Sequence, residues 1–457
     1  MNLEGEPRQM SRQLELPWED RGEALNVPRS DEAPTAAHGT ECPGAVGLME
    51  AVLERRNMEA ALRRVKKNRG SPGVDGMTTD ELLPYLRGHW ARIRASLLDS
   101  TYTPAPIKRQ SVPKSGGGTR ELGIPTVLDR LIQQALLQVL QPIFDPTFSE
   151  HSFGFRPGRS AHDALRAATR HVQSGHRVVV DVDLEKFFDR VHHDVLMGKL
   201  AKRIEDRRVL RLIRRYLQSG VMVDGVLMQR WEGTPQGGPL SPLLANVLLD
   251  EVDKELEVRG HAFVRYADDA RVFVRSQRAG ERVLGQLRTL FGRLRLRINE
   301  AKSAVAPAWD RPFLGYSMWV APGKTVRLRV ARKALDKMKD RVRQITRRHA
   351  GRSLSHVIGE LRSYLLGWHG YFALAATPRL FATLDQWIRR RLRALQLHQW
   401  KRGRTVFREL RLRGASTRVA AEVAAQTHRW WWNACHRVHL ILRNSHFAQL
   451  GLPQLAP

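Results

Sequence analysis

Residues 262–275 are the most informative segment of this chain, because two apolar stretches flank a short acidic turn. Ala262–Tyr266 and Arg271–Arg275 are rich in aromatic and β-branched residues, and Asp268 and Asp269 lie between them. Two such stretches with so short a connection predict an antiparallel β-hairpin with the acidic pair at its tip. The fold must therefore contain a sheet that presents two carboxylates at one edge.

A second acidic cluster ends another apolar stretch. Residues 177–183, RVVVDVD, predict a buried strand that finishes with Asp181, Val182 and Asp183. Carboxylates at the ends of buried strands repel one another unless a cation joins them. Aspartates from two strands at one sheet edge form an oxygen-rich site for Mg²⁺, and such a pair can hold two ions about 3.5–4 Å apart for phosphoryl transfer. Ordinary turns and helix caps also use Asp-Asp pairs, so the pair is informative only in context.

Helical periodicity dominates the rest of the chain. The spacing of apolar residues predicts helices over 47–68, over 125–141 and from Pro242 to Gly260, and a mostly helical pattern beyond residue 331. The cluster Gly70–Gly73 ends the first of these helices. The order is helices, a core of mixed strands and helices, and then helices again.

The charge of the chain points to a polyanionic partner. The sequence has 76 Lys and Arg against 46 Asp and Glu, a net charge of +30, and its 42% hydrophobic content excludes disorder throughout. Residues 1–45 carry a net charge of −5 and predict a disordered acidic N-terminal tail. Residues 321–457 contain 28 basic and six acidic residues. The same stretch contains six tryptophans, Trp368, Trp387, Trp400, Trp430, Trp431 and Trp432.

Interleaved bases and aromatics suit a surface that neutralises phosphates and stacks on nucleobases. A solvated helical face above core tryptophans is the alternative interpretation. Two distant cysteines, Cys42 and Cys435, exclude a four-thiolate zinc site and a disulfide framework, and they favour a reduced intracellular setting. No secretory signal and no membrane-spanning segment is expected.

Several short motifs occur in order along the chain. The turn Tyr266–Asp269 has the YxDD form of reverse transcriptases, and Gln236–Pro242 is similar to their QGxxxSP block. Asp183 with the following Phe187–Asp189 resembles their first carboxylate block. The remaining segments are Asn68–Gly76, Arg120–Thr126, Ser152–Ser160, Phe313–Gly315, Trp387–Arg393 and Gly451–Pro453. Together these motifs resemble those of group II intron-encoded reverse transcriptase/maturases, and the similarity extends from about residue 48 to the end.

The resemblance implies an α+β fold, a right-hand polymerase with an antiparallel sheet in its fingers and palm, followed by an α-helical thumb/maturase domain. The implied domains are an N-terminal extension (46–105), the fingers and palm (106–325) and the helical thumb/maturase (X) domain (326–457). Because the chain ends just after the maturase-like block, we expect no His-Asn-His endonuclease domain.

The same resemblance implies the roles of the acidic residues. Asp183, Asp268 and Asp269 are the expected catalytic residues, and together with Leu184 they are expected to bind two Mg²⁺ ions. Ala270 stands where many relatives carry a bulkier residue, a difference that alters packing behind the site without touching a ligand.

Five further residues are implied to bind the incoming dNTP. Phe188 matches the position whose ring excludes a 2′-hydroxyl, although it also suits a packing role in the palm. Lys114 and Arg120 flank the glycine run of a predicted hairpin and are expected to hold the triphosphate, unless they belong to an exposed cationic loop. Gln236 is expected to line the pocket. Lys302 is a candidate proton donor to pyrophosphate, although Ala301–Ser303 departs from the usual Glu-Lys-Thr and solvated lysines are common near helix ends.

The basic C-terminal region is expected to bind RNA, through Arg389, Arg390, Arg391, Arg393, Lys401, Arg402 and Arg404. The expected partners are group II intron RNA, an RNA template with a DNA primer or target DNA, and dNTPs, in the bacterial cytoplasm or at the nucleoid when DNA is bound. The sequence leaves the oligomeric state open.

The leading interpretation is an RNA-directed DNA polymerase that copies intron RNA into cDNA and assists splicing and mobility. A non-catalytic RNA-binding splicing chaperone is one alternative, which a primed dNTP incorporation assay distinguishes. A domesticated reverse transcriptase in defence or repair is another, which the presence of intron RNA flanking the gene distinguishes.

Overall fold

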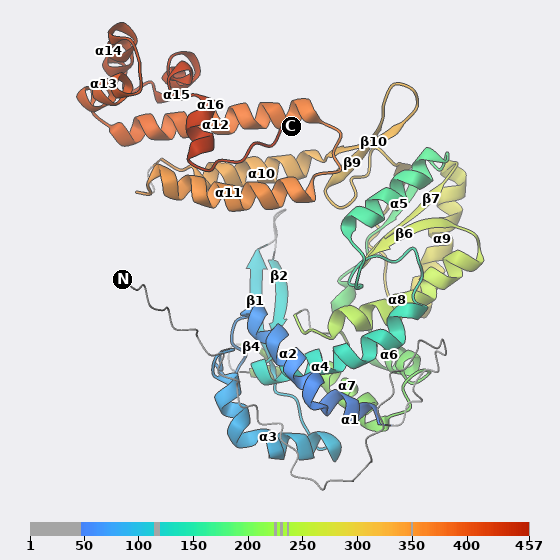
Figure 1. Cartoon of the computed structure of the whole chain (residues 1–457). Coiled ribbons are helices and arrows are strands. Elements are labelled where there is room, and N and C mark those ends of the chain that lie inside the picture. The colour runs from blue at the N-terminus through green and yellow to red at the C-terminus, as the bar shows by residue number, and fades with distance from the viewer. Residues whose placement is uncertain are drawn as a thin grey trace, which may run out of the picture. The chain divides into compact units, whose positions relative to one another are not determined.

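The computed structural model describes residues 47–113, 119–223, 226–228, 232–234, 237–348 and 351–456 (Figure 1). Two compact units divide the chain. The first comprises the residues up to Ala164 together with Val180–Val305, and the second comprises Leu165–Val179 together with Ala306–Pro457. The tail predicted for residues 1–45 lies outside the described residues.

Helices begin the described part of the chain, as expected from its periodicity. Those that precede the acidic hairpin are α1 (Leu48–Leu53), α2 (Arg55–Asn68), α3 (Leu82–Leu98), α4 (Val127–Phe144), α5 (Ala161–Gln173), α6 (His193–Leu200), α7 (Arg207–Gln218) and α8 (Ser241–Val258), with 3-10 turns at Asp145–Thr147 and Phe187–Asp189. The single helix predicted over 47–68 is wrong. Glu54 has φ −57° and ψ 137°, an extended conformation that ends α1 before α2 begins.

Helices α2 and α4 pack together through side-chain amides. Asn57 Nδ2 donates to Ala135 O at 3.1 Å, and Gln138 Nε2 donates to Asn57 O at 3.0 Å and to Asn57 Oδ1 at 2.6 Å. Because buried polar groups need partners, these bonds determine the register of α4 against α2.

One four-stranded sheet of the first unit has the order β2-β1-β4-β5. Its strands are β1 (Ile107–Pro113), β2 (Thr119–Ile124), β4 (Val221–Val223) and β5 (Val226–Met228). Strands β1 and β2 pair antiparallel, with Pro113 opposite Thr119, which confirms the hairpin predicted here. Its glycine-rich loop, residues 114–118, lies outside the described residues.

The second four-stranded sheet has the order β6-β7-β3-β8. Its strands are β3 (Val178–Val182), β6 (Ala262–Tyr266), β7 (Asp269–Val274) and β8 (Ala304–Pro307), and α9 (Gln277–Arg293) follows β7. Strands β6 and β7 form the predicted antiparallel hairpin, with Tyr266 opposite Asp269. The loop consists of Ala267 and Asp268 alone, so β7 begins at Asp269 and not at the predicted Arg271.

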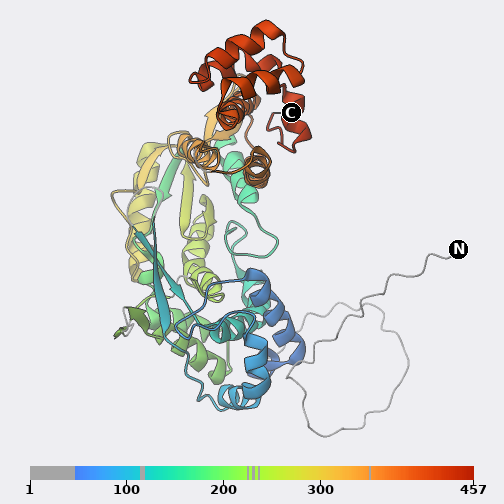
Figure 2. The same cartoon turned by 90° about the vertical axis from the view of Figure 1, so that its left-hand side faces the viewer.

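The C-terminal part is helical apart from the antiparallel pair β9 (Tyr316–Val320) and β10 (Val326–Val330). Its helices are α10 (Arg332–Ile345), α11 (Leu354–Tyr371), α12 (Pro378–Trp400), α13 (Gly403–Leu412), α14 (Thr417–Ala425), α15 (Trp430–His436) and α16 (Asn444–Gln449), with a 3-10 turn at Val438–Leu440. Helices α10, α11 and α12 lie side by side (Figures 1 and 2). The α+β class with a helical C-terminal region is confirmed. Among the described helices, none is long and apolar enough to cross a membrane.

Candidate active site

The two acidic segments come from neighbouring strands of the second sheet. Asp183 is the first residue after β3, and Asp268 directly precedes β7, the strand beside β3. Arg271 on β7 pairs with Asp181 on β3, with 3.1 Å between Nη2 and Oδ1. The structure therefore brings Asp183 and the Asp268–Asp269 turn to the same end of one sheet.

The hairpin turn has a strained backbone. Ala267 has φ 58°, whereas Asp268 does not have a positive φ. A two-residue loop with positive φ at its first position only matches a type II′ turn, in which this position favours glycine. An alanine in such a conformation costs about 1–3 kcal/mol, so other contacts must hold the turn in place.

Arg265, two residues before Ala267, makes such contacts. Its side chain is 2% exposed, and its Nη1 donates to Ala267 O at 2.9 Å and to Asn246 Oδ1 at 2.8 Å. Its Nε and Nη2 donate to the carboxylate of Asp253 on α8, at distances of 2.5–2.9 Å. A buried ion pair therefore connects the aspartate turn to helix α8.

A separate segment of the chain, around Phe153 and Gly154, also contacts the turn. Phe153 N donates to Arg265 O at 2.9 Å, so this segment lies alongside β6. At the next residue, a Cβ on Gly154 would lie 2.1 Å from Ala267 N, which only glycine avoids. Asn246 Nδ2 donates to Gly154 O at 3.0 Å, so the same asparagine contacts both Gly154 and Arg265.

The electrostatics of the turn centre on Asp269. Burial raises the pKa of Asp269 to about 6, the nearby Arg271 guanidinium opposes this rise, and the like charges of Asp181 and Asp268 add to it. Arg271 Nε lies 3.5 Å from Asp269 Oδ1. The Asp269 side chain keeps 41% of its surface accessible, so the direction of the shift rests on the carboxylates around it as well as on burial.

We expect Asp269 to make the free energy of unfolding fall as the pH rises from about 4 to about 6. A carboxyl with a folded-state pKa above its unfolded value binds its proton more tightly when folded. This stabilisation is complete below pH ~4 and is lost as the pH rises through about 6. Asp269→Asn stays neutral at every pH, so its unfolding free energy in urea without divalent cations should rise relative to wild type across this window. A difference that stays constant with pH would contradict the shift.

The backbone at Asp183 is held by the segment that follows α9. Asn299 N donates to Asp183 O at 2.8 Å, and Asp183 N donates to Ser303 Oγ at 3.0 Å. Leu184 forms an isolated bridge with the same segment. Lys302 Nζ lies 3.4 Å from Asp183 Oδ1, which places this lysine beside the first carboxylate.

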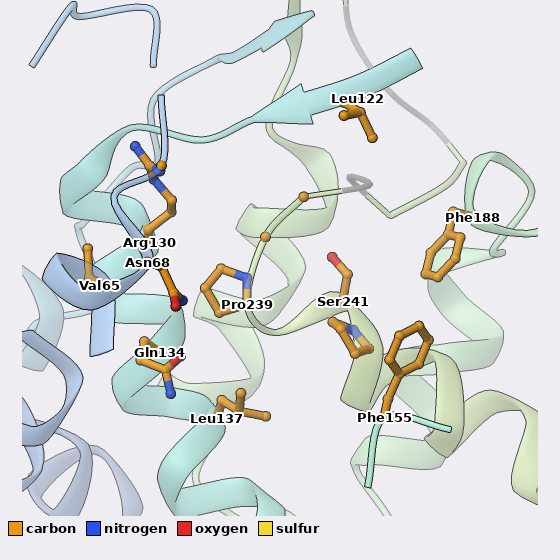
Figure 3. A pocket seen from close by; sticks show the side chains of 14 residues that line it. Val65, Asn68, Leu122, Arg130, Gln134, Leu137, Phe155, Phe188, Pro239 and Ser241 are labelled. Carbon is orange, nitrogen blue, oxygen red and sulfur yellow. The ribbon is translucent and has the colours of Figure 1, made fainter. Parts of the chain in front are cut away.

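The first unit contains a cavity of about 550 Å³. Phe155 and Phe188 line one side of it and Arg130 and Gln134 of α4 line the other, with Gly237–Pro239 between them (Figure 3). The backbone of Phe188 is held by Thr234, whose N–H donates to Phe188 O at 2.7 Å. The Phe188 ring, which is expected to exclude a 2′-hydroxyl, therefore forms part of the cavity wall.

Three of the predicted nucleotide-binding groups cannot be placed. Lys114 and Gln236 lie outside the described residues. For Arg120 only the backbone is described, opposite Val112 in the β1–β2 hairpin. Their roles remain predictions.

Aspartate oxygens are the hard donors that Mg²⁺ prefers, but they form only a partial site here. In the described part of the chain, no three His, Cys, Asp or Glu side chains are grouped closely enough to hold a metal ion. Mg²⁺ commonly binds through one or two carboxylates, with water and substrate phosphates completing its shell. Asp183 and Asp268 therefore suit the ion in chemistry and in sheet position, whereas Arg271 engages Asp269.

The predicted RNA-binding residues differ in exposure. Arg390, Lys401, Arg402 and Arg404 are exposed, and Arg389 is half-buried. Two others make internal contacts on α12. Arg391 Nε donates to Thr346 Oγ1 at 2.7 Å, and Arg393, which is buried, donates from Nε to Leu442 O at 2.9 Å. These two guanidiniums contribute to the packing of the C-terminal helices α10–α16 (the helical unit).

The residues that support the turn were not predicted from the sequence. They are Arg265, Asp253 and Asn246, together with the pair of Asp181 and Arg271. A signal was present, because Arg265 and Arg271 are charged residues inside strands that are otherwise apolar, and a buried charge requires a partner. Their partners on α8 and β3 could not be identified from the sequence.

Comparisons with known proteins identify the families to which this chain is similar. Residues 112–318 match the family of reverse transcriptases (RNA-dependent DNA polymerases), and residues 335–414 match the maturase-specific domain of group II introns. The chain is 32% identical over 313 residues to Protein YkfC of Escherichia coli K12, an alignment that covers 59% of this chain and 82% of YkfC.

A second relative is the group II intron-encoded protein LtrA of Lactococcus lactis subsp. cremoris. It is 37% identical over 195 residues, which cover 42% of this chain and 32% of LtrA. A chain of the solved partial Cas6-RT-Cas1–Cas2 complex is 24% identical, and the match covers 54% of this chain and 42% of that one. Its TM-score of 0.36 is too low for a functional comparison. The two matched families and the coverage of YkfC show that this chain belongs to the group II intron-encoded reverse transcriptase/maturases.

Proposed function

We propose that the chain is an RNA-directed DNA polymerase that copies intron RNA into cDNA. In this proposal residues 46–105 form an N-terminal extension, 106–325 form the fingers and palm, and 326–457 form the thumb/maturase domain. The substrates are dNTPs and an RNA template annealed to a DNA primer. The site residues are those named from the sequence, including Lys114, Arg120 and Gln236.

One observation carries the proposal, namely that Asp183 and the Asp268 turn lie at one sheet end. When bound, Mg²⁺ would activate the primer 3′-hydroxyl and neutralise the triphosphate. In the reaction the 3′-hydroxyl gives up its proton to solvent, its oxygen bonds to the α-phosphorus, and the bond from that phosphorus to the pyrophosphate oxygen breaks. Asp183 and Asp268 would hold the ions, and Lys302, beside Asp183, would give the departing pyrophosphate a proton.

Template-primed dNTP incorporation with Mg²⁺ tests the proposal directly. We expect incorporation that requires both the RNA template and the divalent cation. If the purified chain binds intron RNA and promotes splicing but incorporates no dNTP, the non-catalytic chaperone replaces the polymerase as the function.

Replacing Phe188 with alanine should let the chain accept ribonucleotides. The ring lines the cavity, and its removal takes away the group that would clash with a 2′-hydroxyl, so rNTP use relative to dNTP should rise by about tenfold to a hundredfold. Phe187→Ala is the matched control, because Phe187 is buried at a ring distance of 5.1 Å from Phe188 and does not line the cavity. An unchanged rNTP/dNTP ratio in Phe188→Ala would refute the gate.

We further propose that the helical unit binds intron RNA. Trp431 and Trp432 are 41% and 40% exposed, and the guanidiniums of Arg390 and Arg437 lie 5.5 Å and 5.7 Å from their respective ring centroids. Exposed rings beside cations can stack on unpaired bases while the cations neutralise phosphates. This observation supports a role in splicing alongside polymerisation.

A further inference from the structure

The wall of the cavity opposite Phe188 is lined by polar and cationic side chains. It is formed by the end of α2, the loop after it and the first turns of α4, with Asn68, Gly70, Arg130 and Gln134 as lining residues. Figure 3 shows the Arg130 and Gln134 side chains across the Gly237–Pro239 segment from Phe188. The four residues bring only neutral or cationic groups to this wall.

Two buried donors on this wall lack partners. Gln134 is 7% exposed, and its Nε2 has no hydrogen-bond acceptor among the described residues. The same holds for Nε of Arg130, which lies four residues earlier on α4 and therefore on the same face. Buried donors almost always find acceptors in a folded protein. Two buried donors without acceptors on one cavity wall therefore indicate a ligand that supplies hydrogen-bond acceptors.

The arginine is held in place on this wall. Its Nη2 donates to Ser71 O at 2.6 Å, and a Cβ on Gly70 would lie 2.1 Å from its Nη1. The glycine therefore leaves the space that the guanidinium occupies. The loop after α2 and helix α4 together fix a pair of donors that face an electronegative ligand.

A neighbouring glutamine on the same helix has an amide donor with acceptors inside the protein. Gln138 lies one turn after Gln134, and its Nε2 donates to Asn57 O and Asn57 Oδ1. The amide donor of Gln138 therefore has acceptors inside the protein, although its Oε1 has no donor among the described residues. The Gln134 Nε2 has no acceptor there.

We propose that Gln134 and Arg130 bind the template-strand nucleotide that pairs with the incoming dNTP. The inference rests on the proposed polymerase function, in which Phe188 contacts the sugar of the incoming nucleotide. In a base pair the template nucleotide lies across from that sugar, and so toward the wall of Gln134 and Arg130. A nucleotide supplies the acceptors that these donors lack, on its base edge, its sugar and its phosphate.

The test compares two RNA–DNA duplexes by fluorescence anisotropy, without dNTP and without catalysis. One duplex is blunt, and the other carries an unpaired RNA overhang that supplies a templating nucleotide. Wild type should bind the overhanging duplex more tightly. Gln134→Leu should lose this preference by roughly fivefold to tenfold, while its affinity for the blunt duplex stays unchanged. Because no nucleotide is incorporated, a failure of the polymerase proposal and a failure of this one are separate results.

Gln138→Leu is the matched control, and thermal unfolding is the second measurement. We expect Gln138→Leu to lower Tm and keep the overhang preference, because it loses internal hydrogen bonds only. Gln134→Leu should not lower Tm, because it removes a donor that has no internal partner. The proposal is overturned if Gln134→Leu keeps the wild-type overhang preference, or if it lowers Tm as much as Gln138→Leu does.

Discussion

Asp268→Asn is expected to abolish template-primed DNA synthesis and to leave RNA affinity nearly intact. The substitution keeps the size of the side chain, but it replaces one acceptor oxygen by an NH2 donor and removes the Asp268 charge at the tip of the β6–β7 hairpin. Loss of a carboxylate that holds a catalytic metal removes several kcal/mol of transition-state stabilisation, so incorporation should fall by about a hundredfold to a thousandfold or more. Single-turnover incorporation and RNA binding measured on the same preparation would check both statements.

Asp194→Asn is a suitable control for this experiment. Asp194 is a surface aspartate, 70% exposed and paired with Arg214 at 2.7 Å, and surface ion pairs contribute little. Its substitution should leave incorporation within about twofold of wild type. Wild-type synthesis by Asp268→Asn would show that this carboxylate holds no essential metal ion.

Arg265→Met is expected to weaken both folding and catalysis, for two separable reasons. It leaves Asp253 as an unpaired buried carboxylate, which costs about 3–5 kcal/mol. It also removes the donor to Ala267 O, so the strained turn that carries Asp268 loses a support. Urea unfolding and single-turnover incorporation measure the two effects independently.

The double variant Arg265→Met/Asp253→Leu separates the effect on stability from the effect on catalysis. Replacing a buried ion pair by apolar residues of similar volume is often nearly neutral for stability, so the unfolding free energy should recover most of the loss. Incorporation should stay about tenfold below wild type, because Ala267 O still lacks its donor. If incorporation recovers together with stability, Arg265 contributes to folding only and does not position the turn.

This positioning arrangement explains how a strained alanine is tolerated in the turn. The guanidinium of Arg265 donates to Ala267 O, and Gly154 lies so close to Ala267 N that a Cβ at this position would clash. Neither contact involves the carboxylates themselves. The geometry of the aspartates therefore depends on residues that no metal ion touches.

Much of the local structure was predictable from the sequence, because it depends on neighbours along the chain. Two apolar stretches around a short acidic turn predicted the β6–β7 hairpin, although β7 begins two residues earlier than expected. A β-branched run predicted β3 to within a residue at each end. The break at Glu54 was not predictable, because apolar periodicity continues across it and the backbone alone leaves the helix.

The amino-acid order alone determined the class of fold, the strand ends on which the aspartates stand and the family to which the chain belongs. Only the tertiary structure decided which charged side chains serve the site and which serve the packing. Arg265 meets Asp253 on another element, and Arg393 of the basic run turns inward to Leu442 O. The physical reason is that a buried charged side chain requires a partner, which the sequence indicates, whereas the packing of distant elements determines which residue that partner is.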